Sequence, residues 1–141
     1  MTIRKDAYMT ARRLLIVDDV SQVRADLRTL LPLAGDIEIV GEAANGLEAV
    51  RQVEVLLPDV VLMDLEMPVM SGYEAIRRIK SQFPACRVIA LTVHGYPEAL
   101  ARACQSGADA FVVKGAPLAS LVQEILTKGV SIEYSSYPKK V

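Results

Sequence analysis

Short apolar runs alternate with segments of helical period along most of the chain. The runs are continuous, as is typical of parallel strands that are buried on both faces. The stretch 37–43 (IEIVGEA) instead alternates apolar and polar residues, so we expect it to be a half-exposed edge strand. Four continuous runs predict buried strands, namely LLIV (14–17), VVLM (60–63), VIAL (88–91) and AFVV (110–113).

Helical segments follow each predicted strand. Apolar residues recur at three- and four-residue spacing, and Pro32 and Gly35 are expected to end the first helix. Asn45 with Glu48, and likewise Ser71 with Glu74, resemble capping boxes at helix starts.

Five strand–helix units in succession predict an α/β fold in which a parallel sheet carries helices on both faces. Right-handed crossovers and a single edge-type second strand favour the strand order 2-1-3-4-5. The length of 141 residues fits one domain, which we predict at 12–129. Residues 1–11 are interpreted as a flexible polar arm, and residues 130–141 as a tail or linker remnant.

Composition excludes several classes of function. A net charge of −1 does not indicate a nucleic-acid surface, and no apolar run has membrane-spanning length. The N-terminus lacks the apolar stretch of a secretory signal. Cys86 and Cys104 have no metal-ligand spacing and are expected to be reduced core thiols of a cytoplasmic protein. The single histidine, His94, argues against a histidine metal site or a Ser-His triad.

Polar side chains come directly after the predicted strands. In an open parallel sheet, ligands bind at the carboxyl ends of the strands, near the point where the strand order reverses. The residues that follow the first, third, fourth and fifth strands are Asp18 and Asp19, Asp64, Thr92, and Lys114. Each alone could be a turn former, a helix cap or a solvated charge. Together they predict a site with three carboxylates, one hydroxyl and one ammonium group.

This predicted site favours a divalent cation. Carboxylates about 4 Å apart repel by roughly 4 kcal/mol per pair at an effective dielectric constant of about 20. Lys114 offsets one of the three charges, and Mg²⁺, which prefers oxygen ligands and often bridges carboxylates to phosphate, would offset the rest. The pattern therefore indicates a Mg²⁺-dependent phosphoryl site with a carboxylate nucleophile.

Four stretches of the chain resemble one known family. LLIVDDV, PDVVLMDLEMPVMSGYEAI, VIALTVHG and GADAFVVKG are similar to the receiver domain of two-component response regulators, across residues 13–129. The resemblance implies a flavodoxin-like receiver fold and makes Asp64 the phosphoacceptor. It implies that Asp18, Asp19 and Asp64, with the backbone carbonyl of Glu66, bind Mg²⁺.

The resemblance also assigns switch residues and partners. Thr92 would bond the phosphoryl group, Lys114 would pair with its oxygens, and Phe111 would move inward when Thr92 moves. The phosphoryl group would come from a phosphohistidine of a sensor histidine kinase or a phosphotransfer protein. The chain would catalyse only its own phosphorylation and dephosphorylation, without being an enzyme toward other substrates.

Some positions depart from the usual pattern or suggest further contacts. Val93 is larger than the usual residue and could narrow access to Asp64, whereas Glu66 and His94 border the site and would tune hydrolysis. The face formed by 97–128 could mediate a homodimer through Arg102, Asp109 and Lys128, or be an ordinary solvated surface. The basic residues of the N-terminal region are interpreted as a solubilising arm; they are Arg4, Lys5, Arg12 and Arg13.

Three alternatives concern the output and the chemistry. Lys114–Gly115 is common in receivers joined to a helix-turn-helix domain, which suggests the receiver part of a DNA-binding transcription regulator, with no direct nucleic-acid binding by this segment. A stand-alone regulator acting by protein contact is the alternative.

A Mg²⁺-dependent aspartyl phosphohydrolase could use Glu66 as its general acid, but would need a capping insertion. A nucleotide-binding module is rejected because the acids of DDVSQV (18–23) would repel phosphate.

Overall fold

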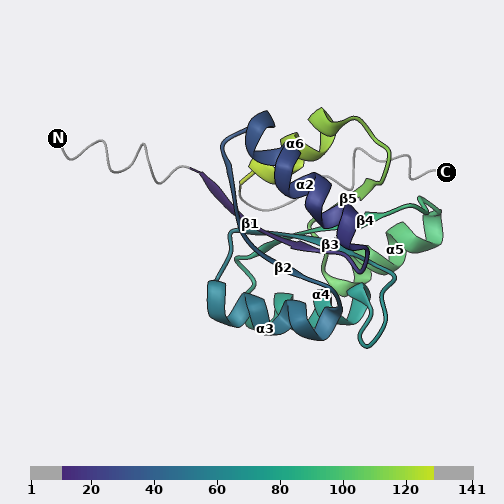
Figure 1. Ribbon diagram of the computed structural model, residues 1–141. Helices are drawn as coiled ribbons and strands as arrows, with labels where there is room; N and C mark the ends of the chain where they lie inside the picture. The colour runs from purple at the N-terminus through teal and green to yellow at the C-terminus, as the bar shows by residue number, and fades with distance from the viewer. Residues whose placement is uncertain (1–10, 129–141) are drawn as a thin grey trace.

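The computed structural model describes residues 11–128, so most of the predicted arm and the whole predicted tail lie outside the described residues (Figure 1). In the described part, five strands alternate with five helices. The elements are β1 (Arg12–Val17), α2 (Ser21–Ala34), β2 (Ile37–Ala43), α3 (Gly46–Leu56), β3 (Val60–Asp64), α4 (Gly72–Gln82), β4 (Arg87–Thr92), α5 (Pro97–Ser106), β5 (Ala110–Val113) and α6 (Leu118–Leu126).

The strands form one parallel sheet in the order β2-β1-β3-β4-β5, which confirms the predicted fold and strand order. Helices α2 and α6 cover one face, and α3, α4 and α5 cover the other (Figure 1). The order reverses between β1 and β3, so the carboxyl ends of these neighbouring strands define the place where a ligand is expected.

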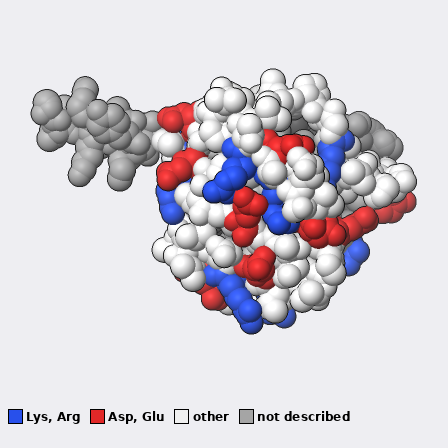
Figure 2. Space-filling model, in the orientation of Figure 1, with Lys and Arg blue, Asp and Glu red and all other residues white. Residues whose placement is uncertain are grey.

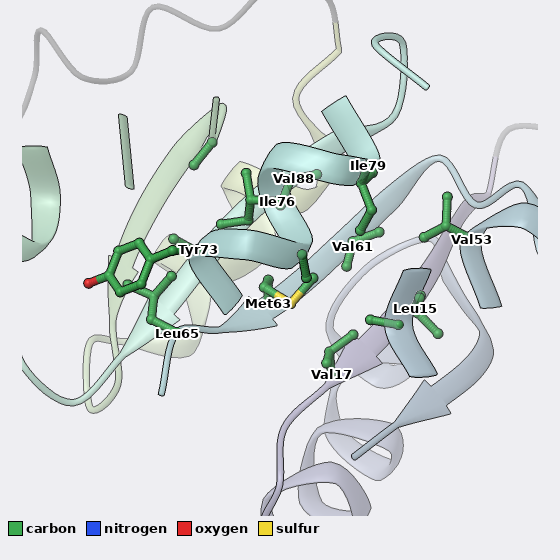
Figure 3. Packing of buried hydrophobic residues seen from close by; sticks show 14 of the residues in the cluster. Leu15, Val17, Val53, Val61, Met63, Leu65, Tyr73, Ile76, Ile79 and Val88 are labelled. Atoms are coloured by element: carbon green, nitrogen blue, oxygen red, sulfur yellow. The ribbon is translucent and has the colours of Figure 1, made fainter. Parts of the chain in front are cut away.

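Successive residues of a strand contribute to two different hydrophobic cores, because their side chains alternate between the two faces of the sheet. In β1, Leu14 and Ile16 point toward α2 and α6, whereas Leu15 and Val17 point toward α3 and α4. Figure 3 shows the second core, where Met63 of β3 packs beside Ile76 of α4. Burial on both faces explains why the central strands are continuous apolar runs.

The edge strand β2 contains an irregularity that the sequence pattern did not reveal. Leu14 pairs with Ile39, but the next residue, Leu15, pairs with Gly41, so Val40 is an extra residue in β2. A bulge of this kind changes which face the following residues occupy. Glu42 consequently lies opposite Ile16, on the α2 side of the sheet.

The helix boundaries agree with most of the predicted signals. Asn45 Oδ1 accepts the Glu48 N–H (2.9 Å), and Ser71 Oγ accepts the Glu74 N–H (3.2 Å). The first helix ends at Ala34 with Gly35 as its C-cap, which confirms the expectation for Gly35. Pro32 lies inside the last turn instead of ending the helix, and the wholly buried Leu31 before it favours the helical path.

Arg12 and Arg13 belong to the fold, and their interpretation as part of an arm is wrong. They are adjacent in β1, so their side chains leave on opposite faces of the sheet. Arg12 donates to the carbonyls of Ile125 and Thr127 at the end of α6, each at 3.1 Å. Arg13 donates to the carbonyls of Leu57 and Leu56 at the end of α3, at 2.8 and 2.9 Å. Each guanidinium group therefore caps a helix C-terminus.

The two cysteines differ. Cys86 is buried as expected, and burial raises the pKa of its thiol to about 11. Cys104 is exposed on α5, so the prediction of a core thiol is wrong there, because this residue lies on the outer side of its helix. Within residues 11–128, no helix is both long enough and apolar enough to cross a membrane.

Candidate functional site

Four neighbouring strands bring the predicted polar residues to one end of the sheet. Asp18 follows β1, Asp64 and Thr92 are the last residues of β3 and β4, and Lys114 follows β5. Asp18, Asp64 and Thr92 are buried, whereas Asp19 is exposed. Carboxylate oxygens of Asp18, Asp19 and Asp64 all lie within 4.8 Å of one another.

Lys114 is the cation that faces this cluster. Its Nζ lies 2.6 Å from Asp18 Oδ2 and 3.7 Å from Asp64 Oδ1. One ammonium group thus faces three carboxylates. The excess negative charge at the mouth of the cluster attracts a further cation, and three carboxylate groups are ligands that suit a hard divalent ion such as Mg²⁺.

The crowding of carboxylates changes the pKa of Asp64. Burial, and next the negative charge of Asp18, raise the pKa of its carboxyl group to about 6, against the opposing effects of Lys114 and the Glu66 backbone N–H. The charged form of the Asp64 carboxyl group is therefore disfavoured at this position. Its energy falls when positive charge approaches or when the charge is transferred into a covalent bond.

Asp18 is held through its backbone as well as its side chain. Its N–H donates to the Ala43 carbonyl (3.1 Å), which continues the β1–β2 pairing. Its carbonyl accepts from Arg24 (2.6 Å), and its Oδ1 accepts the Val20 N–H (2.9 Å). The contact of Arg24 with Asp18 was not predicted from the sequence, because the helical pattern of α2 identifies its apolar positions and not the partners of its charged ones.

The segment after β3 wraps closely around the end of the strand. A Cβ atom at Gly72 would collide with the carbonyl oxygen of Asp64, so the first turn of α4 approaches the strand as only glycine permits. Gly72 N–H also donates to the Leu65 carbonyl (2.9 Å). In this loop Val69 adopts a left-handed backbone conformation with φ of 70°. These contacts fix the direction in which Asp64 leaves the sheet.

The segment after β4 forms the opposite wall. Thr92 Oγ1 accepts the His94 N–H (3.1 Å), and the Thr92 carbonyl accepts the Lys114 N–H (2.6 Å), which ties this wall to the end of β5. His94 stacks on Tyr96 with ring centroids 5.4 Å apart, and its Nε2 lies 4.0 Å from Glu66 Oε1. The side chain of Val93 is 58% exposed. Glu66 and His94 thus border the cluster from two different loops.

Phe111, the predicted switch aromatic, is only 2% exposed and belongs to the core beneath α4 and α5. Among the residues proposed for a homodimer, Asp109 is already engaged within the chain. Its Oδ2 lies 2.7 Å from Lys80 Nζ and accepts the Val88 N–H (2.8 Å). Asp109 thus already pairs within the chain, and its contact with a partner stays a prediction. Arg102 lies over the Tyr73 ring, 3.9 Å from its centroid.

Charges of both signs are interspersed on the visible face of the molecule (Figure 2), and no broad basic area is seen there. The fold, the acidic cluster and the lysine facing it now point to one family. The family model of the response regulator receiver domain matches residues 14–126. The chain belongs to this family.

Curated relatives of this receiver domain include transcription regulators. It is 44% identical over 111 residues to the uncharacterized transcriptional regulatory protein YhcZ of Bacillus subtilis, covering 79% of this chain and 52% of that protein. It is 39% identical over 113 residues to the response regulator GacA of Pseudomonas viridiflava, covering 80% and 53%. The chain thus spans about half the length of these curated relatives.

Solved structures agree with this placement. A two-component response regulator of the LuxR family from Aurantimonas sp. SI85-9A1 is 33% identical with a TM-score of 0.80, covering 89% of this chain and 91% of that one. CheY of Borrelia burgdorferi, in a complex with CheX, BeF₃ and Mg²⁺, is 28% identical with a TM-score of 0.75, covering 82% and 87%.

Proposed function

We propose that Asp64 of this receiver domain accepts a phosphoryl group from a phosphohistidine of a sensor histidine kinase or a phosphotransfer protein. The observation that carries the proposal is the convergence of three carboxylates and Lys114 at the carboxyl ends of neighbouring strands. Burial and the charge of Asp18 raise the pKa of Asp64 to about 6, so its charged form is destabilised in this group. Asp18 is bonded to Lys114 and Val20, and it is therefore less suited to act as a nucleophile.

The acidic cluster would hold Mg²⁺ through Asp18, Asp19, Asp64 and the backbone carbonyl of Glu66. When bound, the ion supplies positive charge that offsets the carboxylates and the phosphoryl oxygens. Asp19 is the exposed member of the cluster, which suits a ligand facing incoming water and substrate. The chain's own residues then have to orient the reactants and neutralise the remaining charge.

In the proposed transfer, an Asp64 carboxylate oxygen attacks phosphorus while the bond between phosphorus and the imidazole nitrogen breaks. The electron pair of that bond leaves with the imidazole, and Asp64 becomes an acyl phosphate. Lys114, which lies 3.7 Å from Asp64 Oδ1, is placed to pair with a phosphoryl oxygen. Water later hydrolyses the acyl phosphate, so the signal limits itself.

Switching would follow from a change in the hydrogen bonds of Thr92. Its Oγ1 accepts the His94 N–H, and its hydroxyl proton could be redirected to a phosphoryl oxygen. Motion of this wall would change the space next to Phe111, which packs in the underlying core. Because Lys114 N–H bonds to the Thr92 carbonyl, the ends of β4 and β5 would respond together.

We assign the output to a longer, cytoplasmic, DNA-binding regulator, since YhcZ is named a transcriptional regulatory protein and is about twice the length that is matched. In this proposal the receiver itself contacts proteins, and the face formed by 97–128 mediates its homodimer. The alternative is a stand-alone regulator acting by protein contact; the complex of CheX with CheY is a solved example of a receiver that contacts another protein.

Val93 is proposed to slow access to Asp64, and Glu66 and His94 to tune hydrolysis of the acyl phosphate. Labelling by a small phosphodonor should then be faster in Val93→Ala than in the natural chain. Equal labelling rates would show that Val93 does not restrict access.

Beryllofluoride, a phosphoryl mimic, tests the acceptor directly. In the presence of Mg²⁺ the natural chain should bind one equivalent, and Asp64→Asn should bind none. Asp19→Ala should weaken Mg²⁺ binding while the circular dichroism spectrum stays unchanged. Multiple turnover of a phosphate ester would instead indicate an aspartyl phosphohydrolase, because a phosphoacceptor does not turn over such a substrate.

A further inference from the structure

Arg24 makes a contact that has no explanation in the packing of α2. Its guanidinium Nη1 donates to the backbone carbonyl of Asp18 at 2.6 Å, and its Nε lies 3.0 Å from Glu42 Oε1. The side chain is 18% exposed, so most of it is withdrawn from water. A charge-assisted bond this short to a main-chain carbonyl constrains the position of that peptide group.

Asp19 lies between two peptide groups that are each held by a hydrogen bond. The carbonyl of Asp18 belongs to the peptide that precedes Asp19, and Arg24 holds it. The N–H of Val20 belongs to the peptide that follows Asp19, and Asp18 Oδ1 holds it at 2.9 Å. Asp19 itself is exposed, so few neighbours pack against its side chain. The two flanking hydrogen bonds hold its backbone, which sets the direction from which its carboxylate approaches Asp64.

The bulge in the edge strand β2 determines the direction of Glu42, the carboxylate that pairs with Arg24. The extra residue Val40 in β2 turns Glu42 to the α2 side of the sheet. There its carboxylate accepts from Arg24 through Oε1 and from Arg28 through Oε2, the latter at 2.6 Å. Without the bulge, the alternation of the strand would direct Glu42 toward α3. The bulge therefore aims the carboxylate that orients Arg24.

We propose that Arg24, oriented by Glu42, is a positioning residue that aims the Asp19 carboxylate into the cation site. This inference rests on the proposed Mg²⁺-dependent function. It assigns Arg24 no contact with the ion or with the phosphoryl group. Groups that orient ligands in this manner commonly change metal affinity by about 10- to 100-fold when they are removed.

Charge and geometry predict opposite results for the removal of Arg24. If Arg24 acted only through its positive charge near the acidic cluster, its loss would strengthen cation binding, since like charges repel. If Arg24 positions Asp19, its loss weakens cation binding. The direction of the change therefore separates the two roles.

The test is Mg²⁺ titration calorimetry on the 141-residue chain and its variants. Arg24→Met and the charge-conserving Arg24→Lys should each weaken Mg²⁺ binding by about tenfold. Arg28→Met is the matched control, because Arg28 contacts the same Glu42 but not Asp18; its affinity should stay within about twofold of the natural chain. Equal or tighter binding by both Arg24 variants would overturn the proposal.

A second readout needs no metal. Hydrogen exchange of the Val20 amide should be faster in Arg24→Met and Arg24→Lys than in Arg28→Met, because the bond to Asp18 Oδ1 loses its support. Unchanged exchange at Val20 in both Arg24 variants would overturn the positioning role. Should the natural chain itself fail to bind Mg²⁺, the proposed function is wrong, and the exchange comparison still decides whether Arg24 holds the 18–20 segment. Glu42→Gln, which keeps Arg24, should give a smaller change in the same direction.

Discussion

Charged side chains are paired differently at the two ends of the parallel sheet. At the amino end, Arg12, Arg13, Lys80 and Arg87 donate to backbone carbonyls, and the last two also pair with acids of the same chain. Each of these four basic side chains thus has acceptors among the described residues. At the carboxyl end, three carboxylates face one ammonium group of the described residues, that of Lys114. A further cation would add stability at this end, which is what the proposed Mg²⁺ site requires.

Helix direction explains where each sign of charge lies. The helices run antiparallel to the strands, so their C-termini, which carry partial negative charge, gather at the amino end of the sheet. Basic side chains there stabilise the fold. Helix N-termini gather at the carboxyl end and favour acids, but Asp18, Asp19 and Asp64 lie too close together for that effect to offset their repulsion. The proposed Mg²⁺ site would account for this acidic crowding.

The largest change in stability is expected at the amino end. Lys80 donates to the carbonyls of Pro84 and Cys86 and to Asp109, at 2.9, 2.8 and 2.7 Å. Lys80→Met should lower the free energy of unfolding by about 2–4 kcal/mol, because it leaves these acceptors without their donor. Urea unfolding followed by circular dichroism measures this, since the chain has no tryptophan.

The exposed Lys128→Met is the control for that change and should alter stability by less than about 0.5 kcal/mol. Mg²⁺ affinity should stay the same in both variants. A loss of Mg²⁺ binding in a folded Lys80→Met protein would contradict the separation of the two ends.

The same substitution of Asn for Asp should have opposite signs at the two ends. Asp64→Asn should raise the free energy of unfolding of the metal-free chain by about 1–3 kcal/mol at neutral pH, because a crowded buried charge is removed. Asp59, whose Oδ2 accepts the Arg13 N–H at 2.9 Å, is the matched acid at the amino end. Asp59→Asn should lower stability by about 1 kcal/mol. Excess Mg²⁺ should remove the advantage of Asp64→Asn, since the natural chain gains more from binding it.

The pH dependence of stability offers a finer version of the same comparison. The folded pKa of Asp64 is about 6, above its ordinary value of 3.8, so the folded state holds this proton more tightly than the unfolded state. Stability contributed by the protonated group is complete below pH 3.8 and is lost as the pH rises through about 6.

The stability of the metal-free natural chain should therefore fall relative to Asp64→Asn across that window. Urea unfolding at intervals of pH measures the difference. A constant difference between the natural chain and Asp64→Asn would contradict the raised pKa of Asp64.

Backbone strain gives the smallest expected effect. Val69, near the site, and Leu57, at the amino end, both have positive φ, of 70° and 49°. Val69→Gly should raise stability by about 0.5–1 kcal/mol, because a branched side chain is the more strained of the two. Leu57→Gly should gain less than about 0.5 kcal/mol, since its side chain also lines a groove beside Phe83. Urea unfolding measures both, and the reverse order would contradict this account.

The fold and the assembly of the site could be predicted because they depend on local patterns with long-range consequences. Buried parallel strands have to be apolar, as in 60–63, and their carboxyl ends have to meet at one edge. This was enough to bring Asp18, Asp64 and Lys114 together.

Features without a local signature were missed. The bulge at Val40 interrupts a pattern that reads as a regular strand, and only the pairing with β1 reveals it. The contact of Arg24 with Asp18 depends on that bulge through Glu42. The role of Arg12 as a helix cap depends on the C-terminus of α6, which lies 113 residues away from it in sequence. Long basic side chains reach many partners, and composition alone does not select one.

The most direct test of the central claim is to locate a phosphoryl group after incubation with a small phosphodonor and Mg²⁺. Intact-protein mass spectrometry of the natural chain should show the addition of one phosphoryl group, and peptide mapping should place it on Asp64. Chelation of Mg²⁺ or the substitution Asp64→Asn should abolish the addition. Phosphorylation at another residue, or an undiminished addition to Asp64→Asn, would contradict the account.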